Sequence, residues 1–105
     1  MALNVILTET ANKNLNNIFH YYKDIANEKV AQRIINKILD KTFLLELQPY
    51  SGQIEDLLAK RKFEFRYLVE GNYKIIYRID EPNVYITTVF DCRQNPVKMQ
   101  EFLKN

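Results

Sequence analysis

The first half of the chain carries apolar residues at helical spacing, in two successive patterns. Thr8 precedes the first pattern and Asn27 the second, and both are residue types that commonly cap a helix N-terminus. Pro49 and Gly52 follow the second pattern and end it. Because the link between the patterns is short, we predict an antiparallel helix hairpin. The apolar positions of the two predicted helices are Ala11, Leu15, Ile18, Phe19 and Tyr22, then Val30, Ala31, Ile34, Ile35, Ile38, Leu39, Thr42 and Leu45.

The remaining apolar residues lie in short runs typical of β-strands. One run, residues 3–7, precedes the predicted hairpin, and residues 62–69, 73–79 and 84–90 follow it. Residues 97–103 are expected to form a short helix or a tail. The order of these elements predicts an α+β domain, in which the helix hairpin packs on one face of a mainly antiparallel four-stranded sheet. The opposite face of the sheet is expected to stay open.

The pairing of the second and third runs decides which side chains share a face of the sheet. A two-residue loop of Gly71 and Asn72 would set Phe65 opposite Arg78, whereas a three-residue loop beginning at Glu70 would set Phe65 opposite Tyr77. We predict the three-residue loop, because it gathers the charged positions of both strands on the open face. That face would carry Lys62, Glu64, Arg66 and Leu68 beside Lys74, Ile76 and Arg78, with an ion pair between Glu64 and Arg78.

Composition places the chain among ordinary globular proteins. Its 105 residues, 47% hydrophobic and 27% charged, suit one domain, residues 1–105, and are too few for two. The formal net charge of +2 is too small to imply nucleic-acid binding by itself. Residues 1–7 lack the basic segment of a signal peptide, and no apolar run reaches the length of a membrane span. We therefore expect a cytoplasmic protein with no membrane partner.

Common catalytic signatures are missing from the sequence. The chain has 2 glycines, too few for a phosphate-binding loop, and its single cysteine and single histidine provide no cluster of zinc ligands. Cys92 is expected to be a small buried thiol rather than a nucleophile, and His20 a structural or solvated side chain. We predict no metal and no cofactor.

Cations near the predicted strands carry the strongest functional signal. Residues 60–62 are all basic, although placement at an ordinary surface explains this run equally well. Arg66 stands in mid-strand between aromatic residues and Arg93 ends the last strand, where long charged side chains usually pair or bind a partner. In the predicted register, Lys62, Arg66 and Lys74 face no obvious carboxylate. We expect an anionic partner, either a phosphate or an acidic protein segment.

Five motifs occur in order along nearly the whole chain. They are Leu7-Thr8-Glu9-Thr10-Ala11, Leu47-Gln48-Pro49 followed by Gly52, Phe65-Arg66-Tyr67-Leu68, Asn72-Tyr73-Lys74-Ile75-Ile76-Tyr77, and Val89-Phe90-Asp91-Cys92-Arg93-Gln94-Asn95-Pro96. Together they resemble the RelE/ParE family of bacterial toxins from type II toxin-antitoxin modules. The resemblance implies a small toxin that a cognate antitoxin inhibits by covering or distorting its working surface.

The resemblance also implies one of two targets. RelE-like members cut mRNA on the ribosome with Lys and Arg side chains, here Lys62, Arg66, Lys74 and Arg93, whereas ParE-like members inhibit DNA gyrase. The residues after Arg93 include no Tyr or His, and neither Lys nor Arg matches acid-base catalysis at neutral pH. We therefore favour a ParE-like gyrase inhibitor, with the RelE-like nuclease and a non-toxic basic binding module as alternatives. Contacts to the target or the antitoxin are predicted at Lys62, Arg66, Leu68, Lys74, Ile76 and Arg93.

Overall fold

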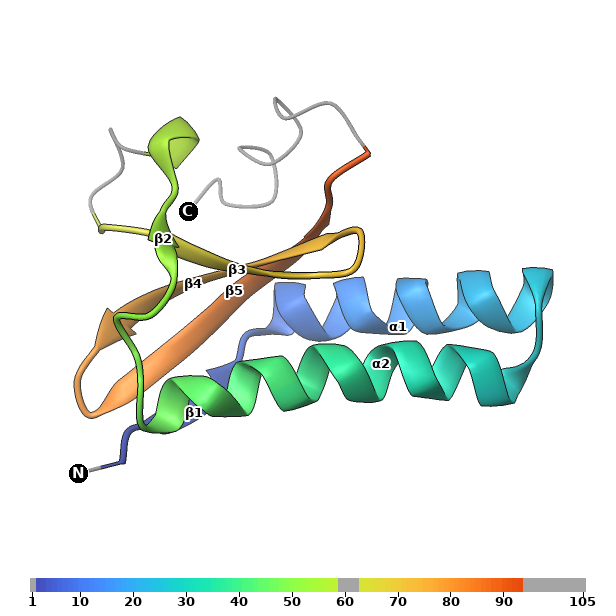
Figure 1. Cartoon of the computed structure of the whole chain (residues 1–105), viewed down its shortest axis with the longest axis horizontal. Helices are drawn as coiled ribbons and strands as arrows, with labels where there is room; N and C mark the ends of the chain where they lie inside the picture. The colour runs from blue at the N-terminus through green and yellow to red at the C-terminus, as the bar shows by residue number, and fades with distance from the viewer. Residues whose placement is uncertain (1, 59–62, 94–105) are drawn as a thin grey trace.

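The computed structural model describes residues 2–58 and 63–93, which form a sheet with a helix hairpin along one face (Figure 1). The strands are β1 (Asn4–Leu7), β2 (Gln53–Ile54), β3 (Arg66–Glu70), β4 (Tyr73–Asp80) and β5 (Asn83–Asp91), in the spatial order β1-β5-β4-β3-β2. The helices are α1 (Glu9–Ile25) and α2 (Glu28–Phe43), with short 3₁₀ helices η1 (Leu44–Glu46) and η2 (Asp56–Leu58). Among the strands that the structure describes, β1 alone runs parallel to its neighbour, β5.

The α+β architecture predicted from the sequence is confirmed, with one correction to the number of strands. The sheet has five strands rather than four, because the two-residue strand β2 pairs with the edge of β3. A strand this short carries no periodic signal, so its sequence reads as a connector. The predicted helix or tail at residues 97–103 lies outside the described residues, as does Lys62 at the start of the predicted strand 62–69.

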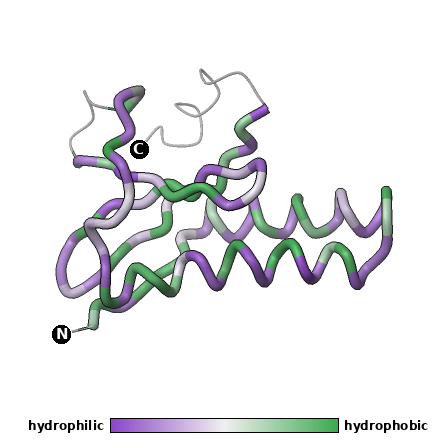
Figure 2. Tube along the Cα trace, viewed as in Figure 1, coloured by the Kyte–Doolittle hydropathy of each residue, from purple (hydrophilic) through white to green (hydrophobic). Residues whose placement is uncertain are grey.

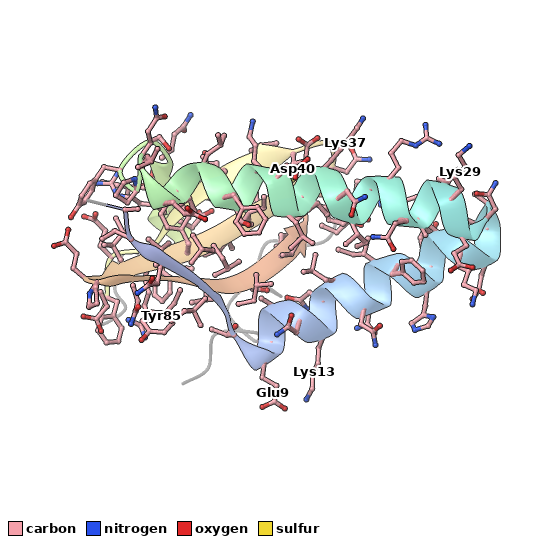
Figure 3. All side chains as sticks on the ribbon, turned by 90° about the horizontal axis from the view of Figure 1, so that it is seen from below. Glu9, Lys13, Lys29, Lys37, Asp40 and Tyr85 are labelled. Atoms are coloured by element: carbon pink, nitrogen blue, oxygen red, sulfur yellow. The ribbon has the colours of Figure 1, made fainter. Side chains whose placement is uncertain are left out.

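Both helices begin at the predicted caps. The Thr8 hydroxyl accepts a hydrogen bond from the Ala11 N–H at 3.2 Å, and the Asn27 side chain accepts one from the Val30 N–H at 2.8 Å. The apolar stripes face each other and the sheet, and hydrophobic positions recur with each helical turn (Figure 2). Charged side chains such as Glu9, Lys13 and Lys29 project outward from the hairpin (Figure 3). None of the described helices is both long enough and apolar enough to cross a membrane.

The predicted register of the β3–β4 hairpin is wrong by one residue. Glu70 pairs with Tyr73, so the connection is the two-residue loop of Gly71 and Asn72. Gly71 has a φ of 59° and the following Asn72 does not have positive φ, as expected for a type II′ turn with glycine at its first central position. Since side chains alternate between faces, this slip moves every β3 side chain to the opposite face from the one predicted.

The sheet face away from the helices is partly covered, contrary to the open face that we predicted. The chain leaves α2, passes the edge of the sheet at β2 and continues onto this face at η2 (Figure 1). Leu58, Phe65, Ile76 and Phe90 form a small second core there, with Tyr67 packed against it. The segment 53–58, which the sequence presents as a connector, therefore closes a second hydrophobic layer.

Helix α1 occupies part of the edge of β5 beyond the end of β1. The Thr8 hydroxyl donates to the carbonyls of Ile86 and Thr87, and the Asn14 side-chain oxygen accepts from the Val89 N–H at 3.0 Å. A β-bulge at Thr87 separates the two halves of β5, because Tyr77 pairs with Ile86 while Ile76 pairs with Thr88. The side chains of Thr8, which caps α1, and of Asn14 within α1 thus take the place of strand partners along this stretch.

The phenol of Tyr77 joins the sheet to the loop that leads into β2. Tyr77 is completely buried; its hydroxyl donates to the Pro49 carbonyl at 2.7 Å and accepts from the Gly52 N–H at 3.0 Å. Gly52 must be a glycine here, because an added Cβ would lie 2.5 Å from the Tyr77 hydroxyl oxygen. Burial raises the pKa of the Tyr77 phenol, so the group stays protonated and able to donate.

Replacing Tyr77 with Phe should destabilise the protein by about 1–3 kcal/mol, because a buried N–H and a carbonyl would lose their shared partner. The free energy of unfolding, measured by urea denaturation, tests this. Tyr50→Phe is the matched control: Tyr50 is 61% exposed, and its ring, which Phe retains, contacts the Arg66 guanidinium. Equal stability of the two variants would contradict the role assigned to the hydroxyl.

Candidate functional site

The predicted site residues do not share one face of the sheet. Arg66 and Leu68 face the helix side, since Arg66 is opposite Tyr77 and Leu68 packs against the main core. Lys74 and Ile76 face the other side, where Ile76 joins the second core. Arg93 follows the end of β5. The prediction that Arg66 and Lys74 lie together on the open face is therefore wrong, because it depended on the three-residue loop.

Arg66 is held by the chain around it. Its Nη1 donates to the Gly52 carbonyl at 2.9 Å, and its Nη2 lies 3.1 Å from the Glu64 carboxylate. The guanidinium also lies over the Tyr50 ring, 5.3 Å from the centroid. Glu64 therefore pairs with Arg66 and not, as predicted, with Arg78. These contacts anchor the loop before β2 to β3, so Arg66 supports the edge of the sheet.

Lys74 also has an internal partner, although none was expected from the sequence. Its Nζ lies 2.9 Å from the carboxylate of Glu55, which is only 3% exposed, and 4.3 Å from the centroid of the Tyr67 ring. Glu55 precedes η2, in the segment that folds over this face. The buried carboxylate and the cation neutralise each other, because an unpaired charge would be costly at this depth.

Arg93 forms a two-point ion pair beside a cleft. Its Nε and Nη2 donate to the Asp91 carboxylate at 2.9 and 2.8 Å, and these hydrogen bonds hold the pKa of Asp91 below its ordinary value. The cleft has a volume of about 450 Å³ and lies between α1 and the end of β5. Its lining residues are Asn14, Asn17, Ile18, Tyr21, Tyr73, Val89, Asp91 and Arg93.

Arg78 is a further cation that the sequence did not single out as functional. Its guanidinium lies 4.3 Å from the Phe63 ring centroid and 4.5 Å from that of Tyr85. The Asp80 carboxylate is 3.7 Å from its Nη1, beyond hydrogen-bonding distance. The signal available in the sequence was the alternation of β4, which correctly placed Arg78 on the face away from the helices.

The exposed apolar side chains differ from those predicted for partner contacts. Ile76 is fully buried and Leu68 is half-buried. Large exposed apolar residues instead follow one another along the segment from the end of α2 to β2, with Leu47 at 77% exposure. They are Phe43, Leu44, Leu47, Tyr50 and Ile54. Their spacing resembles the end of an amphipathic helix, which is why the sequence pattern does not reveal them as surface.

The remaining polar candidates have structural explanations. Cys92 is exposed, so the prediction of a buried thiol is wrong; desolvation of the thiol nevertheless raises its pKa, which disfavours the reactive thiolate. His20 is exposed, with its ring at the edge of Phe19. Within the described part of the chain, no group of three or more His, Cys, Asp or Glu residues could hold a metal ion.

Two solved structures share this arrangement of sheet and hairpin. One belongs to the chromosomal ParDE toxin-antitoxin system from P. aeruginosa; the TM-score is 0.71 at 14% identity, over 86% of this chain and 96% of that one. The other is the toxin-antitoxin complex RelBE2 from Mycobacterium tuberculosis; the TM-score is 0.62 at 22% identity, over 87% of this chain and 92% of that one. At these identities the similarity establishes a common fold.

The family follows from the sequence itself. Residues 5–96 match the model of the ParE toxin of type II toxin-antitoxin systems, parDE. No curated protein matches the chain. Since the match covers most of the chain, the protein belongs to the ParE toxin family, and the resemblance noted from the motifs is confirmed.

The Glu55–Lys74 pair should matter for stability. Lys74→Met should destabilise the protein by about 3 kcal/mol, because it removes the cation that lies 2.9 Å from the buried Glu55 carboxylate. Adding Glu55→Gln should restore part of the loss. The control is Lys13→Met on α1, which breaks an exposed pair with Glu9 and should cost less than about 0.5 kcal/mol. Urea denaturation of the three variants and the wild type would measure these effects.

The Asp91–Arg93 pair should add to the acid sensitivity of the fold. Because the pKa of Asp91 is depressed in the folded state, the pair stabilises the protein above the unfolded pKa of about 3.9, and this contribution is lost as the pH falls through the lower folded-state value. Arg93→Gln should raise the Asp91 pKa toward its ordinary value. An NMR titration of the Asp91 carboxyl would measure the shift, and an unchanged midpoint would contradict the pairing.

Proposed function

We propose that this ParE-family toxin arrests growth by inhibiting DNA gyrase, rather than by cutting mRNA on the ribosome. The observation that carries the proposal is the separation of the candidate catalytic cations. Arg66 lies on the helix side of the sheet and Lys74 on the opposite side, and each has a carboxylate partner within the chain. Lys62 lies outside the described residues.

A metal-free nuclease requires its cations to converge. Cleavage of RNA by electrostatic stabilisation needs donors aimed together at the phosphate on which negative charge develops. Cations on two faces of one sheet cannot contact the same phosphate without rearrangement of the strands. Their internal ion pairs would also have to break. The geometry therefore favours an inhibitor that acts by binding, which needs only a complementary surface.

The proposal includes a cognate antitoxin as partner. The two similar structures come from a ParDE system and a RelBE2 toxin-antitoxin complex, which supports such a partner for this chain. Its docking surface would include the exposed apolar residues Leu44, Leu47, Tyr50 and Ile54, beside the edge strand β2. An apolar segment next to an edge strand suits a partner chain that becomes ordered as it binds.

The RelE-like nuclease is the second candidate function. Its support is the structural similarity to a chain of the RelBE2 complex, together with the cations that lie against aromatic rings at Tyr67 and Tyr85. Aromatic and cationic side chains on a sheet can also receive unstacked RNA bases. For this candidate function, Arg66 or Lys74 would have to stabilise the cleaved phosphate without the other.

Purified protein should inhibit supercoiling by gyrase and leave mRNA on stalled ribosomes intact. Induced expression should arrest growth, and co-expression of the neighbouring reading frame should relieve the arrest. The reverse pattern, codon-specific cuts on ribosomes with normal supercoiling, would favour the nuclease. Normal growth at full expression of folded protein, with salt-sensitive binding to any polyanion, would instead favour the non-toxic binding module.

A further inference from the structure

The described cations of the sheet differ in how many of their N–H donors are already used. Arg66 donates to a backbone carbonyl, Lys74 to Glu55, and Arg93 to both oxygens of Asp91. Arg78 forms no hydrogen bond with any residue that the structure describes, and its buried Nη1 lacks a partner. A guanidinium has five donors, so Arg78 keeps most of its capacity to bind an anion.

Aromatic rings hold the Arg78 guanidinium in place. Its two ring contacts, Phe63 and Tyr85, come from different segments of the chain. The orientation of Tyr85 is fixed in turn, because its hydroxyl accepts a hydrogen bond from Asn83 at 3.1 Å, and Asn83 accepts one from Asn4 at 3.3 Å. A planar cation held by rings loses less conformational freedom on binding than an exposed lysine does.

Two partly exposed apolar side chains flank the Arg78–Tyr85 contact. Ile6 pairs with Tyr85 across the β1–β5 ladder, and it is 38% exposed on the same face. Phe63 is 41% exposed. Figure 3 shows Tyr85 beside the strands, at the end of the molecule opposite the turn between α1 and α2. Arginine and aromatic residues surrounded by apolar contacts are the residue types that dominate binding energy at protein interfaces.

We infer that the surface formed by Ile6, Phe63, Arg78 and Tyr85 docks an acidic segment of a partner protein, with a carboxylate on Arg78 and an apolar side chain against Ile6. The inference deepens the proposed function: it takes the partner protein that supplies the carboxylate to be the toxin's target, and in this it rests on the proposed function. Asp80, at 3.7 Å and with 63% of its side chain exposed, is free to turn away as the partner's carboxylate arrives.

A protein partner fits this surface better than a nucleic acid does. The faces of the Tyr85 and Phe63 rings nearest the guanidinium are already in contact with it, so they are not available for stacking bases. The Asp80 carboxylate lies 3.7 Å from Arg78, and its negative charge would oppose a phosphate backbone, whereas a single carboxylate of a partner could take its place. A nucleic acid is therefore an outcome that the test must distinguish.

A first experiment tests the surface without reference to gyrase. Protein labelled with ¹⁵N is titrated with a capped eight-residue peptide of alternating glutamate and valine, with the same peptide carrying glutamine for glutamate, and with an eight-nucleotide oligouridylate. We expect the glutamate peptide, at millimolar concentration, to shift the Arg78 Nε–H signal and the amides of Ile6 and Tyr85. Absence of these shifts, or shifts caused by the oligouridylate and not by the glutamate peptide, would overturn the inference.

Two variants control that experiment. Arg78→Gln should abolish the shifts at Ile6 and Tyr85, whereas Arg33→Gln, on an exposed position of α2, should leave them unchanged. Arg78→Lys keeps the charge but not the planar fork, and should bind more weakly than the wild type. Thermal unfolding of each variant would confirm that it is folded at the temperature of the titration. Equal shifts in wild type and Arg78→Gln would count against the inference.

A second experiment tests whether the partner is gyrase. Arg78→Gln should raise the concentration needed to inhibit supercoiling by at least about tenfold, because it removes one side of a desolvated charge pair. If wild type inhibits gyrase and Arg78→Gln inhibits it equally well, the docking inference is wrong and the proposed function stands. If wild type has no effect on gyrase but the peptide shifts require glutamate and Arg78, the proposed function is wrong and the acidic docking surface stands.

Discussion

The hydrogen bonds of the buried Tyr77 hydroxyl are the interaction on which the arrangement of the β2 edge of the sheet depends. It fixes the loop between Pro49 and Gly52 against the middle of β4, and the Gly52 carbonyl in turn receives Arg66 from β3. With this loop in place the chain can turn past the sheet edge, pair as β2 and continue to the opposite face. Glu55 and Leu58 then lie over that face, where Glu55 pairs with Lys74 and Leu58 packs in the second core.

Most of the backbone architecture could be predicted from the sequence, because it depends on local signals. Thr8 and Asn27 mark the helix starts, and the alternation from Tyr73 to Ile79 correctly assigns the faces of β4. The strand β2 could not be found in this way, since two residues show no period. It is defined by its pairing with β3, which sets Gln53 opposite Tyr67 and Ile54 opposite Arg66.

The arrangement of the site was harder to predict, because it depends on whether the β3–β4 loop has an even or an odd number of residues. A single residue of difference in the loop at Gly71 exchanges the two faces of β3, and the sequence allowed both loops. The ion pairs of the β3 side chains depend on the same loop length, because it decides which face of the sheet they share. Glu64 was assigned to Arg78 and belongs to Arg66, while Glu55 was not expected to reach Lys74 from the connector. Cations that looked available from the sequence have internal partners in the structure.

Helix α1 has a second role besides its contribution to the core. Thr8 and Asn14 occupy backbone groups of β5 that would otherwise face solvent where β1 ends. An exposed strand edge invites pairing with other chains, and natural proteins commonly cover such edges. In this protein the side chains of Thr8 and Asn14 cover part of the β5 edge in this way, although β1 is only four residues long. The same helix also forms one wall of the neighbouring cleft, so that Asn14 both satisfies a backbone group of β5 and lines the cleft beside it.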